Sequence, residues 1–193
     1  MISYLHCYVN DRPNTDWNTC GTAAIATIAD YWGKNPYNLS RKERDSRDGL
    51  WYWDDGEAID AIKNGGFGPD VVFGWGSTGG RIVDALKSYG LSSFVGYSGA
   101  FSFGWENLWS YLKIDVNGNR PVPVMLDLGA IGGPSWAVHW AIAYKVDSEK
   151  VYLGNCPWNP NPSINDFLNA WHCWYLPYGF NHCGVYSYRP LSS

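Results

Sequence analysis

A cysteine, Cys20, lies between a polar turn and an alanine-rich apolar segment in the stretch DWNTCGTAAIATIADYW, residues 16–32. Asn18 and Thr19 precede it and are residue types that cap helices, and apolar residues recur after it at intervals of three and four before Gly33. This pattern predicts a helix that begins near Cys20. A thiol in the first turn of a helix is close to unsatisfied N–H groups and to the positive end of the helix dipole, which lower its pKa below about 8.5. Cys20 is therefore a candidate thiolate nucleophile.

A thiolate nucleophile needs a base within hydrogen-bond reach and a third group that orients the base. His139 begins the stretch HWAIAYKV, which predicts an inner strand of a sheet, and Asn155 ends the next predicted strand, KVYLGN. If these strands form a hairpin around residues 147–150, His139 faces position 158 and Asn155 lies about one diagonal step away. A twist or a bulge would bring the side-chain amide oxygen of Asn155 to the imidazole. The sequence thus predicts a Cys-His-Asn arrangement.

Each member of this set also has a structural interpretation. A lone cysteine near a helix start is usually a small buried apolar residue, a strand histidine is usually satisfied by a backbone carbonyl, and Asn155 can simply form a turn before CPWNPNP. The predicted proximity of the three residues favours catalysis over three separate structural roles. The other histidines have no comparable setting, and we expect them to be structural or exposed: His6, His172 and His182.

The order and spacing of these blocks resemble the papain-like cysteine peptidases, and specifically the branch of double-glycine leader peptidases from bacteriocin exporters. In that branch a Gln lies six residues before a Cys-Gly-x-Ala helix start, and here Asn14 lies six residues before the Cys20 of CGTA. A His that opens an apolar strand, a strand that ends in Asp-Pro, and a helix that ends in Phe-Leu-x-x-Trp follow in the family. The matching stretches here are HWAIAYKVDSEKVYLGNCPW and INDFLNAW. The segment WSYLKIDVNGNRPVPVMLD is similar to the family's helix, turn and strand before the histidine, so the resemblance covers residues 10–171.

The resemblance implies that Cys20 is the nucleophile, His139 the general base and then the acid, and Asn155 the residue that orients the imidazole. Two positions depart from the family pattern. Asn14 replaces the Gln and is one methylene shorter, so Asn18 or the backbone N–H of Cys20 are alternative donors to the oxyanion. Asn155 replaces the usual Asp, although a neutral Asn fills this position in papain itself.

Most of the 12 tryptophans must belong to the core, because they are the largest apolar side chains in the chain. Trp17, Trp136 and Trp140 are close in sequence to the predicted nucleophile and histidine, and we expect them to line the substrate cleft. The expected reaction is cleavage of peptide or amide bonds through an acyl-enzyme. Acyl transfer by an acyltransferase or transglutaminase-like enzyme with the same triad, and an inactive peptide-binding module, remain as alternatives. No metal ion or organic cofactor is required.

The expected architecture is one α+β domain over residues 1–193, with the papain-like fold and an N-terminal helical part packed on an antiparallel sheet. Besides the helix at Cys20, the patterns predict a loop over 34–55, helices over 56–66, 78–90, 105–114 and 163–171, and strands within 120–129, 138–147, 150–158 and 183–190.

Charge and composition limit the partners. The net charge is −4 and basic residues cluster only in RKER, which excludes nucleic acid as the main partner and favours a peptide or protein substrate. No apolar run is long enough to span a membrane, and the N-terminal stretch lacks the pattern of an export signal, so we expect a soluble chain that is cytoplasmic or delivered as an effector or toxin.

The other cysteines are expected to be buried thiols, and a disulfide between two of them remains an alternative in an oxidising compartment: Cys7, Cys156, Cys173 and Cys183.

Overall fold

The structure is a computed structural model that describes residues 2, 4–8, 18–34, 42–70, 76–98, 104–135, 137–172 and 181–189. Its helices are α1 (Cys20–Tyr31), α2 (Asp55–Ile62), α3 (Gly79–Ser88), α4 (Trp105–Asn117) and α5 (Ile164–Trp171). Its strands are β1 (Lys42–Arg44), β2 (Trp51–Trp53), β3 (Ser92–Ser98), β4 (Val122–Asp127), β5 (Val138–Val146), β6 (Val151–Gly154) and β7 (Asn181–Tyr188).

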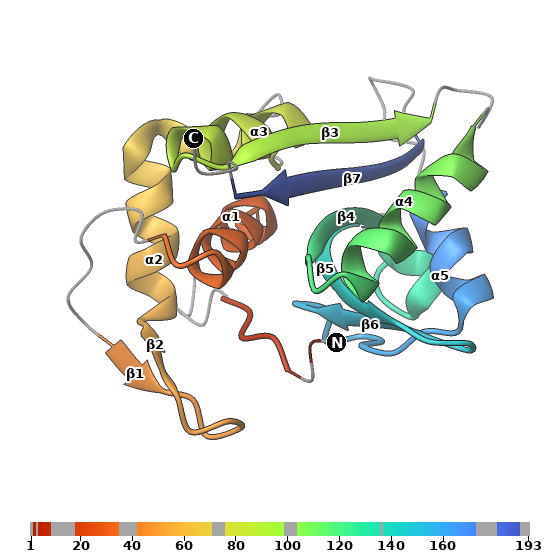
Figure 1. The fold of residues 1–193 in the computed structure, drawn as a ribbon, viewed down its shortest axis with the longest axis horizontal. Coiled ribbons are helices and arrows are strands. Elements are labelled where there is room, and N and C mark those ends of the chain that lie inside the picture. Colours follow the sequence, from red (N-terminus) through yellow and green to blue (C-terminus); the bar gives the residue numbers. More distant parts are fainter. Residues whose placement is uncertain are drawn as a thin grey trace.

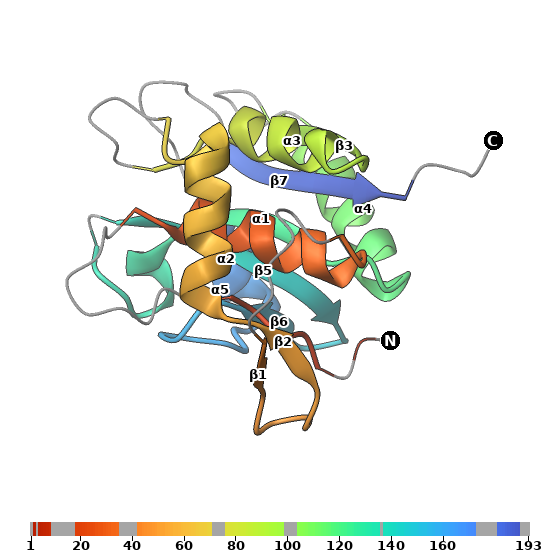
Figure 2. The ribbon, with the colours of Figure 1, turned by 90° about the vertical axis from the view of Figure 1, so that its left-hand side faces the viewer.

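The centre of the molecule is a five-stranded antiparallel sheet with the strand order β3-β7-β4-β5-β6 (Figures 1 and 2). Helices cover both of its faces. Because successive side chains of a strand point to opposite faces, Trp140 and Ile142 of β5 join the core under α1, α2 and α3, while Ala141 and Ala143 join a second core with α4 and α5. The side chains of Trp140 and Ile142 therefore lie on the face of the sheet that α1 covers.

The predicted elements are confirmed apart from two regions. Each predicted helix is present within a few residues, and the four predicted strands are antiparallel strands. Strand β3 was missed, because SSFVGYS contains small polar residues and a glycine that weaken the alternating pattern. The predicted loop over 34–55 is wrong where it is described, since β1 and β2 pair there as a short hairpin of exposed and half-buried residues.

Helix caps differ between the elements. Asp54, Thr78 and Ser163 each accept a hydrogen bond from a backbone N–H in the first turn of α2, α3 and α5, respectively. Thr19 is the N-cap of α1, but its side chain makes no capping hydrogen bond to any described residue. The first turn of α1 therefore keeps N–H groups that other partners can use.

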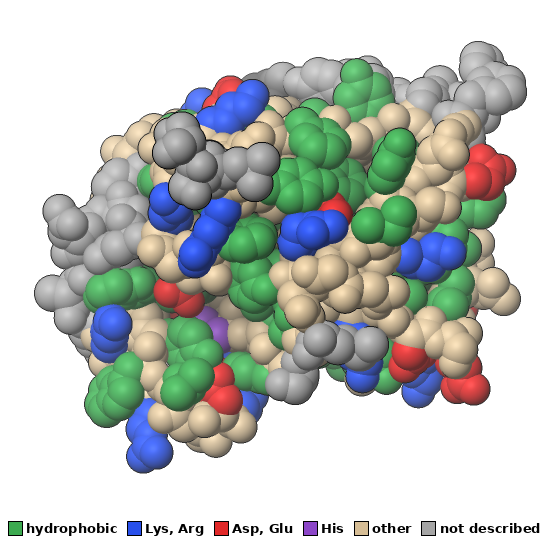
Figure 3. Space-filling model, viewed as in Figure 1, with side chains coloured by type: hydrophobic (Ala, Val, Ile, Leu, Met, Phe, Trp, Pro, Cys, Tyr) green, Lys and Arg blue, Asp and Glu red, His purple; other side chains and the backbone are tan. Residues whose placement is uncertain are grey.

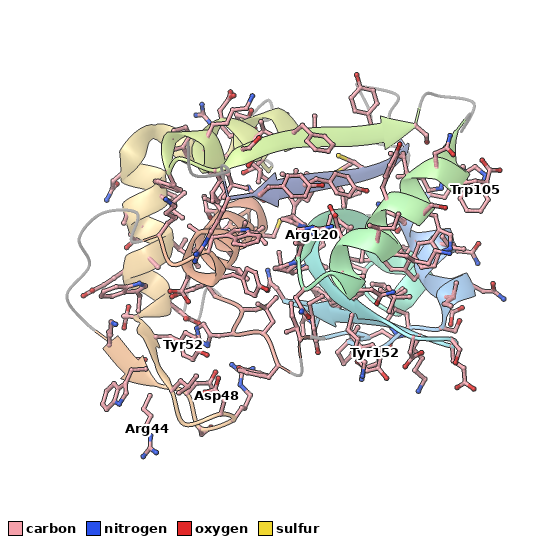
Figure 4. All side chains as sticks on the ribbon, viewed as in Figure 1. Arg44, Asp48, Tyr52, Trp105, Arg120 and Tyr152 are labelled. Atoms are coloured by element: carbon pink, nitrogen blue, oxygen red, sulfur yellow. The ribbon has the colours of Figure 1, made fainter. Side chains whose placement is uncertain are left out.

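An ion-paired histidine fastens the N-terminal segment to the β1–β2 hairpin. The Nδ1 atom of His6 lies 2.8 Å from Asp45 and its Nε2 atom lies 3.4 Å from Asp55 at the start of α2. The imidazole also stacks on the ring of Tyr52, with 3.9 Å between the ring centroids. In Figure 4 Tyr52 and Asp48 lie side by side on the hairpin, where the Tyr52 hydroxyl donates to the Asp48 carboxylate at 2.7 Å. His6 is thus structural, as predicted.

The face formed by β3 and α4 carries several exposed apolar side chains (Figure 3). Phe94 of β3 is 51% exposed and stacks on Tyr186, while Tyr111 and Ile114 of α4 are each 60% exposed. These residues lie on the α4 side of the sheet.

Candidate active site

Helix α1 and strand β5 bring Cys20 and His139 together. Cys20 is the first residue of α1 and His139 is the second residue of β5, and the two elements pack directly against each other. Every residue of α1 from Gly21 to Ala29 is buried, so the helix axis is fixed by the core and Cys20 is held at its half-buried end. This packing brings together Cys20 and His139, which are more than a hundred residues apart in the sequence.

Hydrogen bonds to the sulfur favour a thiolate at Cys20. Burial raises the pKa of this thiol, but a hydrogen bond and charge from His139, together with the backbone N–H groups of Trp140 and Gly21, outweigh burial and lower the pKa. Burial likewise lowers the pKa of His139, and its contact with Cys20 and the carbonyl of Asn155 outweigh that effect and raise it. Opposite shifts of the two pKa values favour a thiolate beside an imidazolium.

The imidazole is oriented by a backbone carbonyl. Nε2 of His139 lies 2.5 Å from the carbonyl oxygen of Asn155, which leaves Nδ1 as the ring nitrogen available to the sulfur of Cys20. The side-chain amide of Asn155 instead donates to the carbonyl of Trp140 at 3.5 Å, the outer limit of a hydrogen bond. Asn155 therefore lies beside His139, with its main-chain carbonyl at the imidazole rather than the side-chain amide that the sequence led us to expect.

Two local features turn the carbonyl of Asn155 toward the histidine. Val146 and Val151 pair as predicted, but the register shifts by one residue between Ala143 and Lys145, so that Ile142 pairs with Gly154. Asn155 then adopts a positive φ of 54°, a conformation that Asn tolerates better than most residues. The bulge and this φ angle together bring the main chain, rather than the amide, to the imidazole.

The tryptophans near the site differ from expectation. Trp140 is 2% exposed and its indole N–H donates to the carbonyl of Ser77 at 2.8 Å, so its predicted place in the substrate cleft is wrong. Successive side chains of β5 point in opposite directions, and the side chain of Trp140 points into the same core as that of Ile142. Trp158 is 43% exposed and meets the His139 ring edge-on, with 5.5 Å between the centroids. Trp158 was not among the site residues predicted from the sequence, and its closeness to Asn155 in the stretch NCPW was the feature that could have indicated it.

Several predicted site residues lie outside the described part of the chain, namely Asn14, Trp17 and Trp136. Asn18 is described, is half-buried and lies two residues before the candidate nucleophile. Cys7, Cys20 and Cys156 are free thiols. Cys7, Cys156 and Cys183 are buried, as expected, whereas Cys173 lies outside the described residues.

The described residues contain neither a cluster of metal ligands nor a helix that could span a membrane. No three His, Cys, Asp or Glu side chains among them are grouped so that they could hold a metal ion. None of the helices in the described ranges combines the length and the apolar character needed to cross a bilayer.

Comparison with solved structures links this fold to a peptidase domain. The chain is similar to the crystal structure of the peptidase domain of ComA from Streptococcus, a bifunctional ABC transporter involved in a quorum-sensing pathway. The TM-score is 0.52 and the sequence identity is 16%, and the match covers 91% of this chain and 94% of that chain. No protein-family model matches the sequence, and no curated protein matches it. The chain therefore has the mixed α+β fold of a papain-like peptidase domain, as predicted.

Proposed function

We propose that this chain is a papain-like cysteine peptidase that cleaves peptide or amide bonds with Cys20 and His139. The observation that carries the proposal is the hydrogen bond between these two side chains, at the start of a buried helix and with opposite pKa shifts on the two groups. The fold shared with a peptidase domain supports the same reaction class. Asn155 completes the set through its carbonyl, which accepts from His139.

The reaction begins when the sulfur of Cys20 attacks the carbonyl carbon of the substrate and forms a C–S bond. The carbonyl oxygen becomes an oxyanion, and His139 then donates its proton to the leaving amine nitrogen as the C–N bond breaks. The product is a thioester on Cys20. Water attacks this thioester, His139 accepts the proton of the water, and the thiolate leaves as the carboxylic acid product is released.

The carbonyl of Asn155 supports the step in which the imidazole is charged. It accepts a hydrogen bond from Nε2–H, so it stabilises the imidazolium and keeps the Nδ1–H directed to the sulfur and the leaving group. The oxyanion would be bound by the backbone N–H of Cys20 in the uncapped first turn of α1, assisted by the side chain of Asn18 or Asn14. A carbonyl carries only partial charge, so the ion pair depends strongly on the donors around the sulfur.

Alkylation by iodoacetamide tests the proposal without knowledge of the substrate. At pH 6.5 we expect Cys20 to react at least about tenfold faster than the buried thiols, because its thiolate is populated below the pH at which an ordinary thiol ionises. His139→Ala should reduce the rate at Cys20 to that of an ordinary thiol, and His172→Ala, at the exposed end of α5, should leave it unchanged. Peptide mapping by mass spectrometry assigns the label to each cysteine.

Peptide cleavage tests the reaction itself. Incubation with a mixture of unstructured peptides should yield hydrolysed products with the wild-type chain and none with Cys20→Ser. A Cys20 that reacts no faster than Cys156, or whose rate does not respond to His139→Ala, would contradict the proposed pair.

A further inference from the structure

The N-terminal segment 4–8 bridges the two halves of the candidate site. In Figure 1 it runs below α1. Tyr8 is fully buried, and its backbone N–H donates to the hydroxyl of Thr27 at 3.1 Å. Thr27 lies two turns after Cys20 on α1, and its hydroxyl donates in turn to the carbonyl of Ala23 at 2.9 Å. One end of the bridge is thus fixed to the helix that carries the nucleophile.

The preceding residue, Cys7, contacts the other half of the site. Its side chain is buried against the backbone of Gly154, the last residue of β6, so closely that a Cβ atom on Gly154 would overlap the sulfur. The backbone N–H of Asn155 also hydrogen-bonds to this sulfur. Burial raises the pKa of Cys7 to about 12, so this thiol remains protonated and acts by contact rather than as a second nucleophile.

These contacts meet at the residue whose carbonyl orients the histidine. The N–H of Asn155 faces Cys7, and its C=O lies 2.5 Å from Nε2 of His139. The φ angle of Asn155 is 54° and sets the direction of its carbonyl relative to its N–H. The chain must keep this angle for the carbonyl to point at the imidazole. Cys7 fills the space beneath this turn and binds its N–H, while the adjacent Tyr8 ties the same segment to α1.

We infer that Cys7 is a positioning residue for the catalytic histidine: it holds the Gly154–Asn155 turn in the conformation that directs the Asn155 carbonyl to His139. This inference rests on the proposed function. If the turn shifts, the imidazolium loses its acceptor, and the thiolate of Cys20 loses part of its stabilisation. The measurable consequence is a higher pH at which Cys20 becomes reactive.

Two single substitutions and their combination test the contact. Gly154→Ala places a methyl group onto the sulfur, and Cys7→Ala removes the sulfur. We expect each to raise the midpoint of the pH dependence of Cys20 alkylation by about one pH unit, which corresponds to a tenfold loss of thiolate at low pH. In the double variant the two Cβ atoms are 3.6 Å apart, an ordinary contact, so the midpoint should return most of the way to the wild-type value.

Two further variants separate positioning from stability. Cys7→Ser keeps an acceptor for the N–H of Asn155, and its midpoint should stay close to wild type even if the fold is weakened. Val151→Ala removes buried volume at the far end of β6, so it should lower the midpoint of urea unfolding without moving the alkylation midpoint.

The outcomes distinguish this inference from the proposed function. A wild-type Cys20 that ionises like an ordinary thiol overturns both. A wild-type Cys20 that is activated, combined with variants at Cys7 and Gly154 that unfold more easily but keep the wild-type midpoint, overturns the positioning role alone. If Cys7→Ala does not fold, the double variant and Cys7→Ser still test the inference. Both should have an alkylation midpoint near that of the wild type, and failure of both to approach it contradicts the inference.

Discussion

Replacing Asn155 by glycine separates the role of its main chain from that of its side chain. Glycine adopts a φ of 54° without strain and keeps the carbonyl that lies 2.5 Å from His139. The substitution removes the side chain, whose amide donates to the carbonyl of Trp140 at 3.5 Å. We therefore expect Asn155→Gly to retain an activated Cys20.

The expected change in Cys20 reactivity depends on the strength of the hydrogen bond that the substitution removes. A hydrogen bond to a charged group contributes about 1.5–3 kcal/mol, so an amide that oriented the imidazolium would, when removed, reduce the thiolate population roughly 10- to 150-fold. The weak contact to Trp140 contributes far less. Alkylation of Cys20 at pH 6.5 should accordingly stay within about threefold of the wild-type rate in Asn155→Gly.

The assay measures the rate of Cys20 alkylation from pH 4 to 9 for the wild type, Asn155→Gly and Asn155→Ala. Alanine at this φ angle costs about 1 kcal/mol of stability, so Asn155→Ala should unfold at lower urea concentration and still show a midpoint near that of the glycine variant. A tenfold or larger loss of rate in both variants, with the fold intact by circular dichroism, would refute the assignment of the main-chain carbonyl.

Three other predictions concern residues around the site and the hairpin. Trp158→Ala removes the edge-on ring at His139 and should lower the alkylation rate of Cys20 about 2- to 10-fold at pH 6.5, with Trp158→Phe closer to wild type. The pKa of His6 is raised by its two carboxylate partners, which outweigh burial, so its stabilisation is fully present below about pH 6.5 and is lost as the pH rises through the folded-state pKa. In urea unfolding, His6→Gln should therefore lower the free energy of unfolding by about 1–3 kcal/mol at pH 5.5 and by less at pH 8.5, and an equal loss at both pH values would contradict this. A Cβ on Gly21 would overlap the side chain of Ser77, so Gly21→Ala should cost about 1–3 kcal/mol and slow alkylation, and addition of Ser77→Gly should restore both.

Local patterns in the sequence were sufficient for the elements that carry the site. The spacing of apolar residues and the residues at its ends predicted α1 from Cys20, and the alternating stretch after His139 predicted β5. The hairpin of β5 and β6 followed from the turn residues between them, and the pairing of Val146 with Val151 was predicted correctly. These features depend on residues within about ten positions of each other, which is why a sequence can specify them.

Tertiary structure decided which atoms meet. The bulge after Ala143 and the positive φ of Asn155 lie beside Gly154, which contacts Cys7 of the N-terminal segment, and no pattern near Asn155 reports that contact. They turn a carbonyl rather than an amide toward His139, and the strand's alternation buries Trp140. The sequence by itself thus determined the residue types and the elements that bring Cys20 and His139 to one site. The atom at the imidazole could not be read from local patterns, because the backbone beside His139 contacts Cys7, a residue far away in the chain.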